Sequence, residues 1–345
     1  GLEVAFENGT RSGEVNGINV IELGLKYSNQ DSFLRRTWLF LSFALRSIKI
    51  ALLHKADLVI ATSTPLTAGI PGIVARWLKG TPFVFEVRDL WPELPREMKV
   101  ITNPIVLWMM GVLEWLSYKS AHRLIGLSPG IVEGIIQKNI DSSKIMLIPN
   151  GCDLDIFSNI IKPWRPSEVA DDDFMAVFTG THGIANGLNA VIDAASLLQA
   201  QGYDKIKFVL IGQGKLKPAL QERVKTESLK NVIFLDPVAK TELACLLAGA
   251  DIGLQILANI PAFYYGTSPN KFFDYLSANL PVLTNYPGWV ADLITKNKCG
   301  YAIQPENPEL FSQALRHAMD NKELLAMGDN SLKLAQKKFD RVQLA

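Results

Sequence analysis

The chain has 345 residues, of which 48% are hydrophobic and 20% charged, and this length and composition fit a globular protein of about two domains. Its net charge of +1 argues against a general nucleic-acid partner. The three cysteines, Cys152, Cys245 and Cys299, are odd in number and far apart. They exclude a disulfide framework and a zinc-binding spacing, and they fit a reducing compartment.

Strand-like and helix-like segments alternate along the first half. Strands are predicted at 18–23, 57–62, 82–87, 123–128 and 144–151, with helices at 33–54, 65–80, 104–120 and 129–139. Continuous apolar strands that alternate with helices indicate a parallel sheet covered on both faces. The first half therefore predicts a doubly wound, Rossmann-like α/β domain.

The alternation restarts after a polar, proline-containing segment. Strands are predicted at 173–180, 206–212, 231–236, 251–257 and 281–284, and the clearest helices between them at 188–202 and 215–228. We therefore expect one domain over 1–155, a linker over 156–172 and a second Rossmann-like domain over 173–345. Ligands of open parallel sheets bind at the carboxyl ends of the strands, so two such domains would face a cleft that holds the site.

Two apolar segments raise the question of a membrane. Residues 38–53 contain Arg46 and Lys49, and residues 104–113 are only ten long before Glu114, so neither supplies the ~20 apolar residues of a span. They are either buried core helices or helices whose apolar and basic faces touch a membrane surface.

The stretch "YYGTSPNKFFDYLSANLPVL" (264–283) predicts a helix over 268–278. Ser268 suits the N-cap, and Pro269 suits the first helical position. Helical spacing places Asn270, Lys271 and Asp274 on one face. Phe272, Phe273 and Leu276 would then form the core face.

The start of this helix has the chemistry of an anion site. Backbone N–H groups of Asn270 and Lys271, together with the Lys271 ammonium, would hold a diphosphate, and the Asp274 carboxylate would accept hydrogen bonds from vicinal hydroxyls. The alternative is a capped structural helix with a Lys271–Asp274 pair.

Two glycine-rich turns follow predicted strands of the second half. The first is "FTGTHGIANGLNAV" (178–191) and the second is "IGQG" (211–214), and glycines allow a backbone to approach an anion closely. Neither turn is a Walker A sequence. The residues that would contact an anion are Gly180, Thr181, His182, Gly183, Gly212 and Gly214. The His182 side chain would either donate to a phosphate or cap a turn.

Charged residues crowd the end of one strand in the first half, in "EVRDLWPEL" (86–94). Arg88 could meet a phosphate or a sugar, and Asp89 could accept a hydroxyl hydrogen bond or a proton, with Glu86 and Glu93 beside them. The alternative is an Arg–carboxylate pair that orders the loop. The sequence shows no nucleophile elbow and no metal-ligand cluster, so no metal and no cofactor are expected.

Taken together, these segments resemble glycosyltransferase family 4, with its two-domain GT-B fold, over nearly the whole chain. The resemblance rests on "IPNGCDLDIF" (148–157), the two glycine turns with their helices, and "SPNKFFDYLSANLPVLT" (268–284). "RDLWPE" combined with "SPNKFFDYL" is similar to the subgroup of O-antigen and capsule gene clusters that is identified with N-acetylfucosamine transferases.

The resemblance implies a retaining transferase with a nucleotide-sugar co-substrate, commonly UDP-linked, and a lipid-linked sugar acceptor. It implies a cytoplasmic protein, peripheral on the inner face of a bacterial membrane. Asp274 falls where the family binds ribose, and Arg88 falls where many members carry a histidine. Arg88 and Asp89 would face the transferred sugar and the acceptor, as the catalytic residues, with Glu86 and Glu93 on the acceptor side. The alternatives are a nucleotide-sugar epimerase of the same architecture and a non-catalytic, membrane-docked partner of another transferase.

The sequence departs from the family at the expected donor site. The first Glu of the family's Glu-x7-Glu motif falls on Gly266, and the two cations that clamp the diphosphate fall near Thr181 and Asn186. We expect Lys271 to replace these cations. We expect the backbone of residues 265–268, including Thr267, to replace the glutamate. We also expect the family's first strand and glycine-rich loop to be missing, so the chain is expected to be truncated at its N-terminus.

Overall fold

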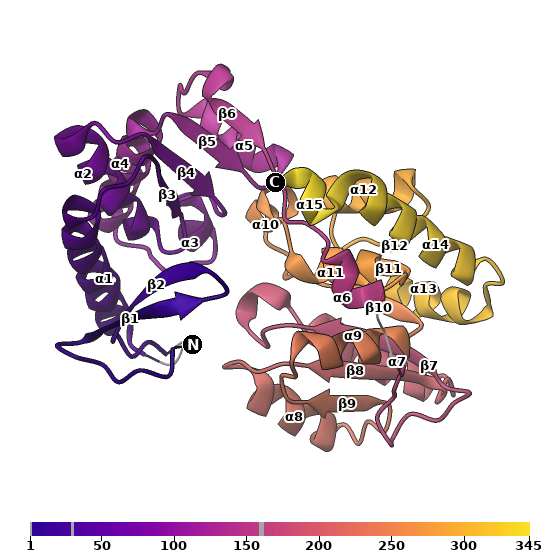
Figure 1. The fold of residues 1–345 in the computed structure, drawn as a ribbon. Coiled ribbons are helices and arrows are strands. Elements are labelled where there is room, and N and C mark those ends of the chain that lie inside the picture. The colour runs from indigo at the N-terminus through magenta and orange to yellow at the C-terminus, as the bar shows by residue number, and fades with distance from the viewer. Residues whose placement is uncertain (1, 29–30, 159–161) are drawn as a thin grey trace. The chain divides into compact units, whose positions relative to one another are not determined.

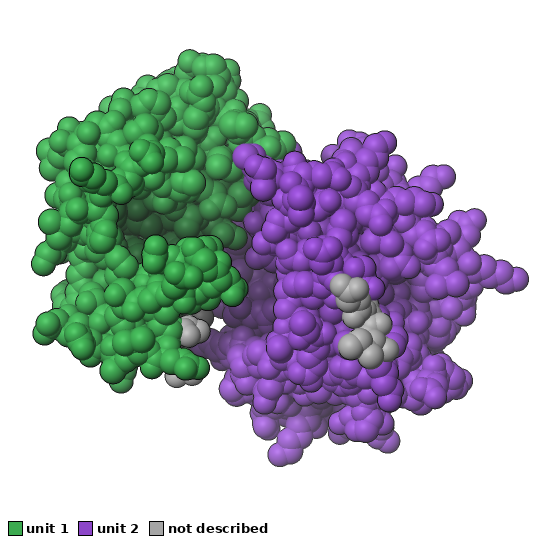
Figure 2. Space-filling model, viewed as in Figure 1, with its two compact units in different colours: residues 1–127, 131–147 green, residues 128–130, 148–345 purple. Residues whose placement is uncertain are grey.

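The computed structural model describes residues 2–28, 31–158 and 162–345, and the fold divides into two compact units. Unit 1 contains residues 1–127 and 131–147, and unit 2 contains residues 128–130 and 148–345 (Figures 1 and 2). Each unit is built around its own parallel sheet. The prediction of two doubly wound α/β domains is therefore confirmed.

The sheet of unit 1 has four parallel strands in the order β3-β4-β5-β6. These are β3 (Val59–Thr62), β4 (Phe83–Val87), β5 (Arg123–Gly126) and β6 (Ile145–Leu147). The helices are α1 (Phe33–Leu53), η1 (Leu66–Ala68), α2 (Gly69–Lys79), α3 (Glu93–Glu97), α4 (Pro104–Ser120), α5 (Pro129–Gln137) and η2 (Ser142–Lys144). Phe83, Phe85 and Val87 alternate along β4 and are fully buried, so β4 is the centre of this core.

The N-terminal strand differs from the prediction. Residues Ile18–Leu23 form β2, but β2 pairs in antiparallel fashion with β1 (Thr10–Val15) and belongs to a separate two-stranded sheet. The turn between them is Asn16-Gly17, with φ of 50° and 81°. An Asn-Gly pair with two positive φ angles is the preferred two-residue hairpin turn, and it explains why the chain reverses here.

Helices α1 and α4 carry exposed apolar side chains. In α1, Leu34, Trp38, Leu41 and Leu45 are exposed, and among the described side chains of this helix only Leu39 and Ala44 are buried. In α4, the exposed apolar residues are Ile105, Trp108, Met109, Val112 and Trp115. The interpretation of these segments as fully buried core helices is therefore wrong. Within the described part of the chain, no helix is both long and apolar enough to cross a membrane.

Unit 2 contains a six-stranded parallel sheet in the order β12-β11-β10-β7-β8-β9 (Figure 1). The strands are β7 (Phe174–Thr179), β8 (Ile206–Ile211), β9 (Val232–Leu235), β10 (Ile252–Gln255), β11 (Val282–Thr284) and β12 (Gly300–Ala302). The strand order reverses between β7 and β10, which are neighbours. In open parallel sheets a ligand crevice forms at this point, beyond the carboxyl ends of the strands.

Helices cover both faces of this sheet. The helices are α6 (Leu154–Ser158), η3 (Ile184–Asn186), α7 (Asn189–Ala200), α8 (Lys217–Thr226), α9 (Lys240–Ala248), α10 (Pro261–Gly266), α11 (Asn270–Ser277), α12 (Trp289–Lys296), α13 (Pro308–Asp320), α14 (Leu324–Leu334), η4 (Ala335–Phe339) and α15 (Arg341–Leu344). Helices α7 and α13 pack together over the face that carries Leu254. Tyr275 of α11 lies against Gly253, so α11 covers the opposite face.

The segment expected to be a linker packs with unit 2. Arg165 donates hydrogen bonds to the Gly249 carbonyl (2.8 Å) and to the Asp251 carboxylate (2.9 Å). Upstream, the backbone N–H of Asn150 donates to Ser268 Oγ (3.1 Å). The division between the units falls between residues 147 and 148, ahead of the boundary at 155 that was expected. Part of the expected linker, 159–161, lies outside the described residues.

Candidate functional site

Three segments of unit 2 meet near the carboxyl ends of β7 and β8. They are the loop 180–187 after β7, the turn 212–214 after β8, and the start of α11. The loop and the turn are joined by a hydrogen bond from the His182 N–H to the Gln213 carbonyl (2.9 Å). Lys271 of α11 donates to Asn186 in the loop (2.7 Å). The structure therefore brings the predicted donor-binding segments together.

The start of α11 differs by one residue from the prediction. The helix begins at Asn270, Pro269 occupies the cap position, and no side chain caps the first turn. Ser268 is not the N-cap because its hydroxyl accepts the N–H of Asn150. The N–H groups of Asn270 and Lys271 have no acceptor among the described residues. The first turn of α11 thus presents two backbone donors.

The prediction of which α11 residues face the core is confirmed. Phe272, Phe273 and Leu276 are fully buried, and Tyr275 and Ser277 are buried with them. Asn270, Lys271 and Asp274 are the residues of this helix that keep some exposure.

The Lys271 ammonium lies between polar and aromatic groups. Besides its hydrogen bond to Asn186 Oδ1, Nζ lies 3.8 Å from the centre of the Phe178 ring. No carboxylate of the described residues lies within ion-pair distance of it. Burial lowers the pKa of Lys271 to about 7. This cation therefore lacks a counter-anion.

The side chain and backbone of Asn186 hold the loop 180–187 that contacts Lys271. Asn186 donates through Nδ2 to the Thr181 carbonyl (2.7 Å), and its backbone N–H donates to the Gly183 carbonyl (3.2 Å). The backbone N–H groups of Thr181 and Gly183 have no acceptor within the described part of the chain. They are available to a ligand.

Glycines are required where the loop and the turn touch. A Cβ on Gly212, whose φ is +148°, would lie 1.8 Å from the Gly180 carbonyl oxygen. A Cβ on Gly214 would lie 2.4 Å from the His182 carbonyl oxygen. A Cβ on Gly180, whose φ is +137°, would lie 3.3 Å from Lys271 Nζ. These glycines thus permit close packing of backbone and Lys271, in addition to any approach of a ligand.

The predicted roles of the His182 side chain are wrong in this structure. Its ring is fully buried beside Phe178 and Phe234, and neither ring nitrogen has a hydrogen-bond partner among the described residues. Burial, followed by the charges of Lys217 and Lys271, lowers the pKa of His182 to about 4. The ring is therefore neutral, caps no turn and is closed to a phosphate.

Lys217, the first residue of α8, was missed by the sequence analysis. Its buried ammonium donates to the carbonyls of Gly212 (2.9 Å) and Leu235 (2.9 Å) and to the Asp236 carboxylate (2.7 Å). All three of its protons are used. Lys217 therefore fixes the turn after β8 and is not free to bind an anion.

A cavity of about 350 Å³ opens beside the loop and the turn. It lies at the carboxyl ends of β7, β8 and β9, and its walls include Gly180, Gly212, Pro237, Val238 and Leu243. Its volume is at the lower end of the range of small-molecule sites. Its lining combines glycines and apolar residues with the polar residues Thr179, Thr181 and Gln213, and it contains no charged residue.

Asp274 takes part in an ion-pair network within unit 2. Its carboxylate lies 3.1 Å from the ammonium of Lys240, which also pairs with Asp153. Asp153 in turn accepts from Arg341 (2.7 Å). Burial raises the pKa of Asp274, while the Lys240 charge opposes this shift. The predicted intrahelical pair of Lys271 with Asp274 is absent from the described ion pairs.

Gly266 is the last residue of α10, a short helix that the sequence analysis did not predict. A Cβ on Gly266 would meet no atom within 4 Å, so the position is open. The next residue, Thr267, is fixed by two hydrogen bonds: its hydroxyl donates to the Phe263 carbonyl (2.9 Å), and its carbonyl accepts from Trp289 Nε1 (2.6 Å). The residue that follows Gly266 is therefore held in place.

In unit 1, the charged residues at the end of β4 do not form the ion pair that was predicted for them. The backbone N–H of Arg88 donates to Ser63 Oγ (2.8 Å), and its guanidinium forms no ion pair within the described residues. Asp89 accepts from the Thr64 hydroxyl (3.1 Å), and burial raises the pKa of its carboxyl. Glu86 lies in β4 and is partly exposed. The predicted Arg–carboxylate pair does not order this loop.

A lysine orders the loop instead. Lys138 pairs with Glu93 (2.7 Å) and with Glu114 (3.2 Å), a buried residue of α4 that the sequence analysis missed. Glu114 also accepts from the Tyr118 hydroxyl (2.8 Å) and from the Trp91 N–H (3.1 Å). Burial, followed by the Glu93 charge, raises the pKa of Glu114 to about 7. Glu93 is therefore committed to a structural ion pair.

No group of three or more His, Cys, Asp or Glu residues in the described part of the chain could hold a metal ion. The candidate donor site in unit 2 thus consists of backbone donors, one lysine without an ion-pair partner among the described residues, and a carboxylate. Arg88 and Asp89 are a separate group of candidate residues in unit 1.

Comparisons with known proteins agree with this architecture. The family model described as "Glycosyl transferase 4-like domain" matches residues 4–151, and the model described as "Glycosyl transferases group 1" matches residues 173–321. The two matches together account for most of both units. The chain therefore belongs to the glycosyltransferases of GT-B fold. A search of curated protein sequences found no match.

Solved structures of the same fold include sucrose-phosphate synthase from Thermosynechococcus elongatus, with a TM-score of 0.76 and 14% identity over 98% of this chain and 83% of the other. HepE from Anabaena, in complex with UDP, has a TM-score of 0.66 and 17% identity over 91% and 82%. WaaG, a glycosyltransferase involved in lipopolysaccharide biosynthesis, has a TM-score of 0.60 and 16% identity over 89% and 92%. At these identities the likeness concerns the fold.

Proposed function

We propose that this glycosyltransferase moves a sugar from a UDP-linked donor, with retention of the anomeric configuration, to a lipid-linked or glycan acceptor in surface polysaccharide biosynthesis. The proposal rests on one observation. Lys271 is a partly buried cation without a counter-anion, and it lies beside the loop 180–187 on the first turn of α11. A buried charge is expected to be paired, and the diphosphate of a donor would supply the missing anion.

Backbone donors support the diphosphate at this position. The unsatisfied N–H groups of Asn270 and Lys271 belong to a helix N-terminus, and those of Thr181 and Gly183 belong to the facing loop. As the sugar leaves the nucleotide, negative charge grows on the diphosphate. Donors and an ammonium that are already in place would stabilise that charge without reorganisation.

The cavity of about 350 Å³ would hold the nucleoside. Its apolar walls at Pro237, Val238 and Leu243 suit the face of a base. Asp274 would accept from the ribose hydroxyls, and the ion pair with Lys240 would keep its carboxylate ionised. The solved complex of HepE with UDP supports the choice of nucleotide.

Arg88 and Asp89 would act on the acceptor side. The Arg88 guanidinium has no carboxylate partner in the described residues, so it can meet a phosphate or a sugar hydroxyl. Asp89 is held by Thr64, and its raised pKa suits a group that takes up a proton from an acceptor hydroxyl. Glu86 would contribute a further acceptor. Glu93 would act only by holding Lys138.

Features of unit 1 favour a lipid-linked acceptor and peripheral membrane association. The exposed tryptophans and aliphatic residues of α1 and α4 suit a lipid interface. A groove of about 1200 Å³ lies between the β1–β2 hairpin and α1, and Arg46, Lys49, Ile50 and Leu53 are among its lining residues. Cations beside apolar side chains suit a phosphate attached to a hydrocarbon chain. The protein would work at the inner face of a bacterial membrane.

The test is transfer from a panel of UDP-, GDP- and dTDP-sugars to a polyprenyl-linked sugar. We expect transfer from a UDP-sugar and a product whose anomeric configuration, determined by NMR, matches the donor. An inverted product would overturn the retaining mechanism. Turnover of the donor without an acceptor would favour an epimerase, and nucleotide binding without transfer, together with a required partner chain, would favour a non-catalytic role.

A further inference from the structure

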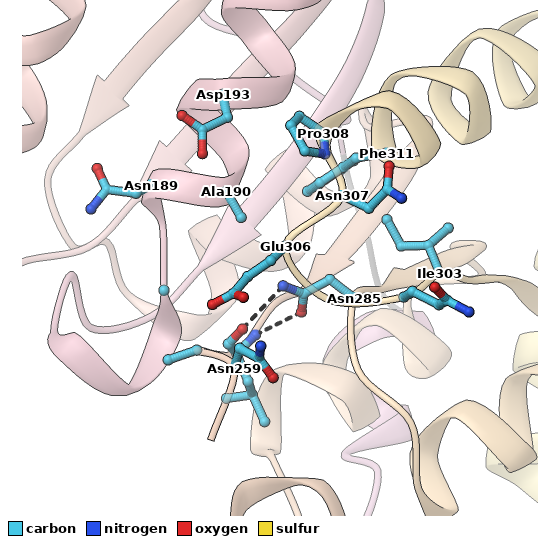
Figure 3. A pocket seen from close by; sticks show the side chains of 14 residues that line it. Asn189, Ala190, Asp193, Asn259, Asn285, Ile303, Glu306, Asn307, Pro308 and Phe311 are labelled. Atoms are coloured by element: carbon cyan, nitrogen blue, oxygen red, sulfur yellow. Dashed lines mark hydrogen bonds between the residues drawn. The ribbon is translucent and has the colours of Figure 1, made fainter. Parts of the chain in front are cut away.

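Unit 2 contains a second cavity, which shares no lining residue with the cavity proposed for the nucleoside. Its volume is about 440 Å³, within the range of small-molecule sites (Figure 3). It lies beyond the carboxyl ends of β10, β11 and β12, between the N-terminal ends of α7 and α13. This is the same edge of the sheet as the topological reversal between β7 and β10, where open parallel sheets form crevices.

The polar lining of this cavity consists mainly of carboxamides. The residues are Asn189, Asn259, Asn285, Gln304 and Asn307. Two carboxylates accompany them, and no lysine, arginine or histidine lines the cavity. One of the carboxylates, Asp193, is already neutralised by Arg223 at 2.5 Å. A site without a lining cation disfavours phosphates and other anions.

Several of these polar groups are fixed by the protein but keep capacity for a ligand. Asn307 caps α13 by accepting the Leu310 N–H (2.9 Å), which leaves its NH₂ group without an acceptor in the described residues. Asn259 accepts the Tyr264 hydroxyl and likewise keeps its NH₂ group. The side chain of Gln304 has no partner in the described parts of the molecule. The cavity thus offers oriented donors.

Glu306 supplies the acceptor. Its side chain extends from the loop before α13 towards Asn259 (Figure 3), and its carboxylate has no ion-pair partner among the described residues. Its backbone has a φ of +53°, in the left-handed region that most residues avoid. Glycine and asparagine adopt this conformation most easily, so the fold holds a glutamate at a position where its Cβ costs some stability.

The remaining walls are apolar. Ala190, Leu257, Ala258, Ile303 and Phe311 line the cavity, and Asn285 fixes one wall by bonding both the N–H and the carbonyl of Leu257 at 3.0 Å (Figure 3). A hydroxyl both donates and accepts, and a sugar ring presents hydroxyls at its edge and C–H groups on its face. Mixed amide donors, a carboxylate acceptor and apolar walls match that pattern.

We propose that this cavity is a second binding site of the protein, for a neutral carbohydrate unit, separate from the nucleotide site. The separation of this cavity from the nucleotide site rests on the proposed function, whereas binding of a carbohydrate in the cavity does not. One wall, residues 257–259, also contacts the loop 180–187, because the Ala258 N–H donates to the Ala185 carbonyl (2.9 Å). A Cβ on Gly187 would lie 2.7 Å from Ala258 Cα, so the two segments are closely packed.

The test uses the full chain and neutral probes: methyl α-glucopyranoside, methyl β-galactopyranoside, N-acetylglucosamine and maltose. Binding is measured by saturation-transfer NMR and titration, with and without saturating UDP. We expect at least one probe to bind with a Kd on the order of 1 mM and UDP to leave that affinity unchanged. Displacement of the probe by UDP, or no binding of any probe, would overturn the proposal.

Variants locate the site. Ala190→Trp fills the cavity and is expected to lower probe affinity at least tenfold while leaving UDP affinity unchanged. Glu306→Gly removes the acceptor and relieves the positive φ, so probe affinity should fall about tenfold while Tm stays equal or rises. The matched control is Lys298→Gly, at another exposed residue with a φ of 53°, outside the cavity. It should change Tm in the same direction and leave binding intact. Unchanged probe affinity in Glu306→Gly and Ala190→Trp contradicts the assignment.

Discussion

The ammonium of Lys271 lies 2.7 Å from Oδ1 of Asn186, and this contact joins the first turn of α11 to the loop after β7. The sequence places the two residues 85 positions apart, one on a helix and one in a loop. The side-chain amide of Asn186 thus accepts a hydrogen bond from the ammonium of Lys271, which belongs to α11. The family resemblance places a cation of the loop itself near Asn186.

Replacing Lys271 with Met tests whether this cation binds the donor. The substitution keeps the length of the side chain and removes the charge. A hydrogen bond to a charged group contributes about 1.5–3 kcal/mol, so UDP affinity measured by calorimetry should fall roughly 10- to 100-fold. Thermal stability should not fall, because the variant no longer buries an unpaired charge. The control is Lys296→Met on the surface of α12, where UDP affinity should stay unchanged. Equal UDP affinity in Lys271→Met and wild type would remove the basis of the proposed diphosphate site.

UDP binding should depend on pH through the same residue. Burial lowers the pKa of Lys271 to about 7, so the unliganded protein loses the ammonium as the pH rises through 7. A bound diphosphate favours the charged form, so binding above pH 7 should take up a proton and weaken as the pH increases. Calorimetry between pH 7 and 9, in buffers that differ in ionisation enthalpy, measures this uptake. The range lies above the second phosphate pKa of about 6. The dependence should disappear in Lys271→Met, and its persistence there would assign it to another group.

Asp274 should discriminate ribose hydroxyls. Asp274→Ala is expected to lower UDP affinity about 5- to 150-fold, as two hydrogen bonds of about 0.5–1.5 kcal/mol each are lost. A UDP analogue that lacks the 2′ and 3′ hydroxyls serves as the matched control, because it cannot use the carboxylate. Its affinity should be the same for wild type and variant. A similar loss with both ligands would mean that Asp274 acts through its ion pair with Lys240.

Alanine substitutions at two glycines of the candidate site, Gly212 and Gly266, should have different effects on the unfolding free energy. Gly212→Ala would place a Cβ 1.8 Å from the Gly180 carbonyl oxygen at a φ of +148°, so it should cost about 3 kcal/mol of unfolding free energy. Gly266→Ala meets no atom within 4 Å at the end of α10, so it should be neutral or stabilise by about 0.5–1 kcal/mol. Urea unfolding measures both. A large loss for Gly266→Ala would show that the position is more confined than the geometry indicates.

Glu114 should make unit 1 less stable as the pH rises. The pKa of Glu114 is about 7 in the folded protein, against 4.5 for an unperturbed glutamate. Between pH 4.5 and 7 the folded state therefore binds more protons than the unfolded state. The contribution of Glu114 to the unfolding free energy should therefore be most favourable below pH 4.5. It should decrease towards pH 7, by at most about 3 kcal/mol. Unfolding midpoints from pH 5 to 8 test this. The decrease should vanish in Glu114→Gln and persist in the exposed control Glu97→Gln.

The sequence predicted the features that depend on local pattern. Apolar strands alternating with helices gave the two α/β units, and the spacing of Phe272, Phe273 and Leu276 gave the buried face of α11. The hairpin was missed although a local signal was present, the Asn16-Gly17 pair between two strand-like runs. The proline at the first position of α10 is a second signal of this kind.

Other features depended on partners far away in the sequence. Ser268 looked like an N-cap, but its hydroxyl is occupied by the N–H of Asn150, 118 residues upstream. Lys217 and Glu114 looked like ordinary members of amphipathic helices until the fold placed the Gly212 carbonyl and Lys138 beside them. His182 looked accessible because glycines surround it, yet Phe178 and Phe234 enclose its ring. Spacing along the chain contains no information about such partners.

The packing of residues 148–158 has a practical consequence for dividing the protein into fragments. Cys152 is buried, and its N–H donates to the Phe339 carbonyl (2.6 Å), while Asn150 fixes Ser268 just ahead of α11. A fragment that begins at 173 would lose both contacts and leave the approach to α11 unsupported. A fragment for studying nucleotide binding in isolation should therefore begin at residue 148, where the chain already belongs to unit 2.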